Sequence, residues 1–274
     1  MCAPVCLTAE RKEKMTEVLE GILWALRFLT GACIFSFLNV VVYRLPRGRS
    51  VVYGRSFCPG CGKTLTSKEL IPCVSYLIQK GKCRACGMKI KKRYVLMEFA
   101  GGFAFVFCGI FFGCGKFGLL SLQGSIAFAY LCILVMVALI DWDTRIIYDR
   151  FHIAVFLLGI VSCLLFPANR ITDCLIGSVI VSLPMFLLAV LIEGAFGGGD
   201  IKLMAASGFL LGWRAVLVAM FLGLIFGGIY CAVMLARGRL SRKDPFAFGP
   251  FLATGLAAAF FWGNEIADAY ASFL

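Results

Sequence analysis

The sequence predicts an all-α polytopic membrane protein with about eight transmembrane helices and a cytoplasmic zinc-binding loop domain between the first two. Hydrophobic residues make up 61% of the 274 positions, and the mean hydropathy is +0.92. Charged residues make up 15%, against about 25% in soluble domains. This fold class is also predicted by apolar runs of membrane-spanning length and by two cysteine pairs within one polar loop.

The apolar runs predict helices rather than strands. A spanning helix needs about 20 mostly apolar residues, and backbone groups in lipid must find hydrogen bonds within the protein. The sixth run is too short to span alone, so we expect it to be tilted, half-buried or continuous with the seventh. The runs are 19–43, 95–113, 118–141, 151–167, 173–193, 201–212, 214–236 and 247–272. We divide the chain into an N-terminal segment (1–18), a first transmembrane helix (19–43), the loop (44–93) and a membrane domain (94–274).

Basic charge sets the expected orientation. Thirteen Lys and Arg residues lie between Arg44 and Arg93, where Glu69 is the one acid. Because positively charged loops stay in the cytoplasm, this loop is expected there. Alternation then places the turn at 142–150 and the stretch 197–200 on the same side, and the turn near 168–172 outside. A second basic cluster also falls on the cytoplasmic side and comprises Arg237, Arg239, Arg242 and Lys243.

The partner expected from this composition is the lipid bilayer. Basic residues do not alternate with aromatic ones as they would in a groove that stacks bases. No nucleic-acid partner is therefore expected.

Four loop cysteines have the spacing of a zinc site. The pattern is Cys58-x2-Cys61-x21-Cys83-x2-Cys86, and two such pairs let four thiolates converge on one Zn²⁺ ion. Four thiolates leave no open coordination position, which favours a structural role over a catalytic one. Free thiols or two disulfides are the alternatives. Cysteines within the apolar runs, such as Cys163 and Cys174, are expected to act as small hydrophobic residues.

Two aspartates interrupt apolar sequence where a carboxylate is unexpected. Asp141 directly follows more than seven consecutive apolar residues at a predicted helix end, where the helix dipole disfavours an anion; Asp143 could add to that effect. Asp200 follows three glycines and opens a short helix, where it can cap the helix as an anion with support from Lys202.

One carboxylate is thus pushed toward protonation and the other toward ionisation, the asymmetry that an aspartyl protease uses. Gly197 and Gly199 would let the backbone approach a substrate closely. The alternatives are a plain helix cap for Asp200 and an acid that reaches the membrane surface for Asp141.

Other reaction classes fit the sequence less well. His152 is the only histidine, which makes a Ser-His-Asp hydrolase improbable. The glycine run does not follow a predicted strand, so it is a weak nucleotide-binding loop. A zinc-stabilised membrane scaffold or a small transporter is the alternative from a different class.

The chain resembles the bifunctional type IV prepilin peptidases, which are membrane aspartyl proteases of the GxGD class (peptidase family A24). The resemblance covers nearly the whole chain in order. It is carried by "FSFLNVVVYRLP" (35–46), the two cysteine pairs with "IPCVSYL" (71–77) between them, "KKRYVLMEFAGG" (91–102), "ALIDWDTRIIYD" (138–149), "GGGDIKLMAASG" (197–208) and "PFAFGPFLA" (245–253). Departures from the family pattern stand at Phe35, Val95, Tyr148 and Ala247.

The resemblance implies a function and assigns residues to it. Asp141 and Asp200 match the catalytic aspartates, and the four loop cysteines match the zinc ligands. Such enzymes lie in the bacterial inner membrane, cleave a basic leader from prepilins or pseudopilins at the cytoplasmic face, and N-methylate the new N-terminus with S-adenosylmethionine. The methyl donor is expected near the loop, with Glu69 or Glu98 close by. A protease that only cleaves, like the archaeal preflagellin peptidases that lack the loop, is the nearest alternative.

Overall fold

The structure is a computed structural model that describes residues 3–113, 118–166, 171–192, 194–239 and 246–273. Its regular secondary structure is helical within the described ranges, where β-structure is limited to two isolated bridges. This confirms the predicted all-α class. The chain divides into two compact units, Met1–Phe128 and Ala129–Leu274, and each is described by itself.

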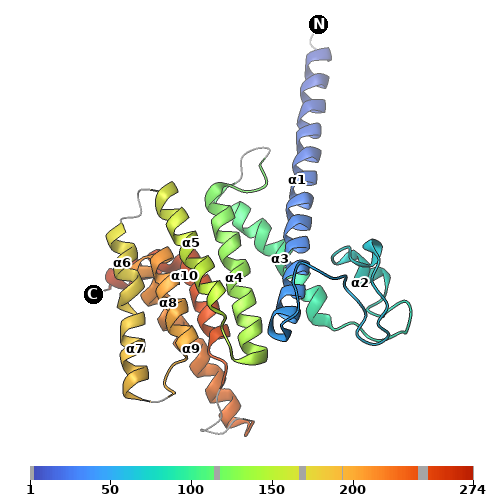
Figure 1. The fold of residues 1–274 in the computed structure, drawn as a ribbon. Coiled ribbons are helices and arrows are strands. Elements are labelled where there is room, and N and C mark those ends of the chain that lie inside the picture. The colour runs from blue at the N-terminus through green and yellow to red at the C-terminus, as the bar shows by residue number, and fades with distance from the viewer. Residues whose placement is uncertain (1–2, 114–117, 167–170, 193, 240–245, 274) are drawn as a thin grey trace. The chain divides into compact units, whose positions relative to one another are not determined.

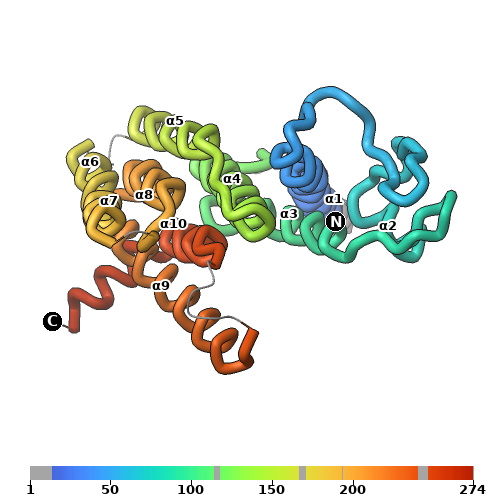
Figure 2. The backbone as a smooth tube through the Cα atoms, turned by 60° about the horizontal axis from the view of Figure 1, so that its bottom comes forward, coloured from blue at the N-terminus to red at the C-terminus, as the bar shows by residue number. Residues whose placement is uncertain are grey.

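The first unit is built on two packed helices, α1 (Ala3–Arg44) and α3 (Lys92–Phe111), which lie side by side in both views (Figures 1 and 2). Glycines allow their close approach. A Cβ atom at Gly101 would overlap the ring of Phe35, which is almost completely buried. Phe35, a departure from the family pattern, is therefore accommodated by a glycine on the facing helix. A single helix covers both the predicted N-terminal segment and the predicted first span.

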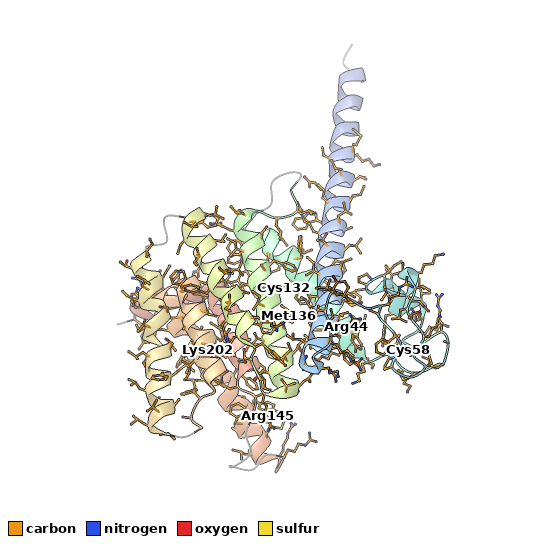
Figure 3. All side chains as sticks on the ribbon, in the orientation of Figure 1. Arg44, Cys58, Cys132, Met136, Arg145 and Lys202 are labelled. Atoms are coloured by element: carbon orange, nitrogen blue, oxygen red, sulfur yellow. The ribbon has the colours of Figure 1, made fainter. Side chains whose placement is uncertain are left out.

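The loop after α1 is organised by Arg44, labelled in Figure 3. The chain leaves α1 through a short 3₁₀ helix, η1 (Leu45–Arg47). The Arg44 guanidinium then donates hydrogen bonds of 3.0–3.1 Å to four backbone carbonyls, those of Ser50, Tyr53, Gly54 and Arg55. Five donors in a rigid fork suit arginine to this task. The rest of the loop contains η2 (Ser67–Glu69) and the short helix α2 (Val74–Ile78).

The second unit is a bundle around one short helix. α4 (Leu122–Thr144) begins in the first unit and continues into the second. The remaining helices are α5 (Asp149–Leu165), α6 (Ile171–Ile180), α7 (Ser182–Leu191), α8 (Gly198–Leu211), α9 (Trp213–Ala236) and α10 (Gly249–Ala271). α8 is buried along most of its length because α5, α6, α7, α9 and α10 all pack against it (Figures 1 and 2).

Small residues let α8 approach its neighbours closely. Added Cβ atoms at Gly177 of α6 and Gly208 of α8 would each overlap the other residue's carbonyl oxygen. Gly212, with φ +83°, turns the chain between α8 and α9. The predicted sixth and seventh segments are therefore separate helices.

One predicted span is broken in two. The segment expected at 173–193 forms α6 and α7, which meet at Val181. Pro184 lacks the backbone N–H that would bond the Ile180 carbonyl, so the hydrogen-bond ladder is interrupted there. The Ser182 hydroxyl donates to the Ser178 carbonyl at this break.

Five segments of the described chain are long and apolar enough to cross a membrane, which identifies a multi-pass membrane protein. They are Lys14–Arg47, Lys92–Phe111, Leu122–Thr144, Ile171–Leu191 and Trp213–Ala236. Arg242 and Lys243 of the second basic cluster, and residues 168–170 of the turn expected outside, lie beyond the described ranges.

Candidate active site

Asp141 lies on α4 and is held by the start of α10. Its side chain is buried, with its residue 6% exposed. The backbone N–H of Gly249 donates a 2.9 Å hydrogen bond to Asp141 Oδ2. α4 continues to Thr144, so Asp141 stands one turn before the helix end rather than at it. This contact joins residues 108 positions apart and cannot be predicted from the sequence of α4 alone.

Asp200 lies at the start of α8 and is also buried, with 9% exposure. The N-cap residue is Gly197, so Asp200 is the third residue of the helix and not its cap. Its carboxylate interacts with the Gly197 backbone and electrostatically with Asp141. Its Oδ1 atom is buried and has no hydrogen-bond partner among the described residues. The bundle therefore brings the two predicted aspartates to one place and leaves one oxygen available there.

The three glycines before Asp200 differ in the space around them. A Cβ atom at Gly199 would lie 2.9 Å from Cβ of Ile147, in the turn that follows α4. One at Gly197 would lie 3.0 Å from Oδ2 of Asp200 itself. A Cβ atom at Gly198 would meet nothing within 4 Å. Gly197 and Gly199 thus let the glycine turn fit against the site, whereas Gly198 has room for a side chain.

Lys202 forms an ion pair with Asp149, and its expected support for the anionic form of Asp200 stays a prediction. Its Nζ lies 2.7 Å from Asp149 Oδ1, and both side chains are exposed. The same carboxylate oxygen lies 3.4 Å from Nδ1 of His152, whose ring is buried beside the backbone of Gly199. These contacts connect the start of α5 to the first turn of α8. Asp143 is exposed near the end of α4.

Two residues at the site were not assigned by the sequence reasoning. Gly249 lies in the closing motif (245–253), but its donor is a backbone N–H. Every residue type except proline has this group, so the sequence does not indicate the role. Asp149 is the last residue of the stretch 138–149, and this position was the available signal for it.

The loop contains two knuckles of the same construction. In the first, the Cys58 N–H donates to the Lys63 carbonyl and the Gly62 N–H to the Cys58 carbonyl, each at 2.9 Å. In the second, Cys83 and Gly87 make the equivalent bonds, also at 2.9 Å. Gly62 and Gly87 have φ of +71° and +72°, a conformation that glycine adopts without strain. Each knuckle thereby turns its two cysteines toward one point.

The four cysteine sulfurs have the geometry of a metal site. All lie within 4.8 Å of one another, and the Sγ atoms of Cys58 and Cys86 are 3.8 Å apart. Tetrahedral zinc with Zn–S bonds of about 2.3 Å places its sulfurs about 3.8 Å apart. Backbone hydrogen bonds from Cys86 and Ala85 lower the pKa of Cys83 to about 6, which favours the thiolate that binds a metal. The residues present therefore fit a closed, four-thiolate ion site.

Glu69 is used within the loop. Its Oε2 accepts 2.9 Å hydrogen bonds from the backbone N–H and the hydroxyl of Thr66. Its Oε1 lies 3.3 Å from Nζ of Lys63, in the first knuckle. The backbone hydrogen bond from Thr66 is the main cause that lowers the pKa of Glu69.

Glu98, on α3, joins three stretches of the first unit. Its Oε1 accepts a 2.8 Å hydrogen bond from the Ser36 hydroxyl on α1. Its Oε2 accepts a 2.7 Å bond from the backbone N–H of Cys73 in the loop. Cys73 is buried and has φ +60°, a region that non-glycine residues seldom occupy. Glu98 thus ties an unusual loop conformation to the helix pair.

Comparisons with known proteins find two family models that match this chain. Residues 29–112 match the bacterial peptidase A24 N-terminal domain, and residues 128–232 match the type IV leader peptidase family. No solved structure gives a significant match.

Curated relatives cover most of the chain. A prepilin leader peptidase/N-methyltransferase of Bacillus subtilis is 34% identical over 245 residues, which are 89% of this chain and 96% of the relative. Proteins of the same name from Burkholderia pseudomallei and Pseudomonas aeruginosa are each 30% identical, over 89% of this chain and 87% and 92% of their own lengths. Identity at this level along nearly all of both chains, together with the two family matches, shows that this chain belongs to the type IV leader peptidase family.

Proposed function

We propose that this protein removes the leader peptide from type IV prepilins or pseudopilins with Asp141 and Asp200, and N-methylates the new N-terminus. The observation that carries the cleavage is the pair of buried carboxylates, 59 positions apart in sequence, that interact within one bundle. The names of the relatives support both activities.

Cleavage would use one water molecule and one shared proton. Two carboxylates close together disfavour double ionisation, so one proton is held between them. The ionised carboxylate takes a proton from water, whose oxygen attacks the peptide carbonyl carbon, while the protonated one donates to the carbonyl oxygen. The C–N bond then breaks, the nitrogen takes a proton, and the leader leaves with a new carboxyl group. The unpartnered Oδ1 of Asp200 is where the water would bind.

The surrounding residues would position this pair. Gly249 holds Asp141 through its N–H. Gly197 and Gly199 leave the space that Asp200 and Ile147 occupy. Lys202 and Asp149 connect α8 to α5. We assign these residues to positioning because none of them contributes a group that exchanges protons with the substrate.

The loop (44–93) would serve the methylation, and residues 94–274 would form the peptidase domain. Cys58, Cys61, Cys83 and Cys86 would hold a Zn²⁺ ion, which supplies folding energy to a loop that has few buried apolar side chains. S-adenosylmethionine, when bound, would supply the methyl group. Both oxygens of Glu69 and of Glu98 already accept hydrogen bonds. We therefore propose that these acids shape the loop rather than contact the donor.

We place the protein in the bacterial inner membrane with eight spans and the aspartates facing the cytoplasm. The concentration of Lys and Arg between Arg44 and Arg93 supports this orientation, because such loops are retained in the cytoplasm.

Substitution of the two acids tests the proposal. Asp141→Asn and Asp200→Asn should each lower leader cleavage by at least about 10²–10⁴-fold, the range for removing general acid–base catalysis. The exposed Asp143→Asn is the matched control and should retain cleavage. Near-normal cleavage by either dyad variant would exclude the pair.

The mass of the product separates the two proposed activities. Purified protein in membranes is incubated with a prepilin and S-adenosylmethionine, and the product is weighed. A product without its leader but without an added methyl group would indicate a peptidase that only cleaves.

A further inference from the structure

Two cysteines at the far end of the second unit face each other across a helix–helix contact. Cys163 lies two residues before the end of α5, and Cys174 is the fourth residue of α6. Their sulfur atoms are 3.2 Å apart, closer than the about 3.5–4.0 Å that separates even the smaller carbon atoms in contact. Both are free cysteines in this structure, with Cys174 buried and Cys163 partly exposed.

We propose that Cys163 and Cys174 form a disulfide bond that joins α5 to α6. Formation of this bond requires the sulfur–sulfur distance to shorten from 3.2 Å to about 2.0 Å. From the sequence alone, both residues are expected to act as small hydrophobic side chains, because the sequence does not show that the two side chains are in contact.

The chemistry is thiol–disulfide exchange with a disulfide-containing oxidant. The Cys163 thiolate attacks the oxidant's disulfide, forms a mixed disulfide and releases one oxidant thiolate. The Cys174 thiolate then attacks the Cys163 sulfur and expels the second. In total the two cysteines lose two electrons and two protons, and the oxidant's disulfide is reduced to two thiols. This order of steps fits the exposure of the two residues, because Cys163 is partly exposed and can react with the oxidant first, whereas Cys174 is buried.

The location fits an oxidising compartment. Cys163 is 14 residues beyond Asp149 on α5, about 21 Å along the helix at 1.5 Å per residue. The pair therefore lies at the opposite end of α5 from Asp149 and Lys202. This step rests on the proposed orientation, in which the aspartates face the cytoplasm and the α5–α6 connection faces outside, where disulfides persist. Asp173, beside Cys174, is a charged residue suited to that boundary.

The bond would fix the two helices that hold α8. α5 and α6 both pack against α8, which carries Asp200 in its first turn. Gly159 of α5 lies against Phe209, and Gly177 of α6 against Gly208. Joining α5 to α6 would keep these contacts in register while leaving the aspartates untouched.

The test is to block thiols in intact cells, purify the protein and map its peptides. Trypsin cuts after Arg150, Arg170 and Lys202, so it separates the two cysteines into peptides 151–170 and 171–202. We expect these peptides to remain joined until a reductant releases them. Recovery of both peptides separately, with both cysteines carrying the blocking group, would overturn the proposal. So would a link that forms only after exposure of the purified protein to air.

Variants complete the design. Cys163→Ser or Cys174→Ser should abolish the link and expose one additional thiol to blocking, whereas Cys231→Ser on α9 should leave the link intact. The Cys163→Ser/Cys174→Ser double variant should retain leader cleavage. Cleavage without a link in the wild-type protein refutes only this inference, and a link without cleavage refutes only the proposed function.

Discussion

At the scale of single residues, the glycines before Asp200 provide a matched pair. Gly199 lies against Ile147, so a methyl group there must push the glycine turn away from the α4–α5 connection. Gly198 has no atom within 4 Å of a Cβ position. We expect Gly199→Ala to lower the rate constant of leader cleavage by about 10²-fold, the cost of misplacing a catalytic group by about 1 Å. Gly198→Ala should cleave at nearly the normal rate. Equal rates for the two variants would show that the fit against Ile147 does not matter.

Gly249 offers a second test of position at the same scale. A Cβ atom there would lie 2.7 Å from Oδ2 of Asp141, and the same residue donates the hydrogen bond that holds this carboxylate. Gly249→Ala should therefore lower kcat by about 10-fold or more, since it displaces a reacting group, with little change in KM. Gly228→Ala on α9, which has open space, is the control. A rise in KM at constant kcat would contradict this role for Gly249.

At the scale of elements, the pair between Lys202 and Asp149 connects α8 to α5. Exposed ion pairs contribute little to stability because water screens the charges, and these side chains are 60% and 68% exposed. Lys202→Asp alone should therefore change the thermal unfolding of the protein only slightly but reduce cleavage. The double reversal Lys202→Asp/Asp149→Lys should recover much of that activity, as measured on the same prepilin. If it does not, Lys202 acts on Asp200 directly, as the sequence suggests.

Elements also show what a sequence can and cannot predict. Apolar runs placed several helices within a few residues, as for the predicted 214–236 and the observed Trp213–Ala236, because lipid leaves the backbone few alternatives. The cysteine spacing indicated the four residues whose sulfurs converge. Side-chain contacts between separate helices could not be predicted in this way. Three such contacts depend on how the helices pack. They are the hydrogen bond from Gly249 to Asp141, the ion pair of Lys202 with Asp149, and the contact of Cys163 with Cys174.

At the scale of the whole molecule, the two proposed activities fall on different parts of the chain. The four cysteines, Ser36 and Glu98 lie in the first unit, and both aspartates lie in the second. The two family matches, 29–112 and 128–232, follow the same division. The contacts described around the cysteines and around the aspartates each stay within one unit. A substitution at the cysteines should therefore not directly remove leader cleavage, and a substitution at the aspartates should not directly remove methylation.

Removal of the metal tests this division. Structural zinc contributes about 10–16 kcal/mol of apparent binding free energy in small zinc-dependent folds, so Cys83→Ser should release the ion and unfold the loop. Methylation of a cleaved pilin should then fall much further than leader cleavage, because Asp141 and Asp200 keep their contacts in the second unit. Metal analysis should give one zinc per wild-type chain and a reduced amount in the variant.

Cys33→Ser, at an exposed cysteine of α1, is the matched control and should keep both the zinc and the methylation. An equal loss of cleavage and methylation in Cys83→Ser would mean that the peptidase site requires the loop, and a full zinc content would mean that Cys83 is not a ligand.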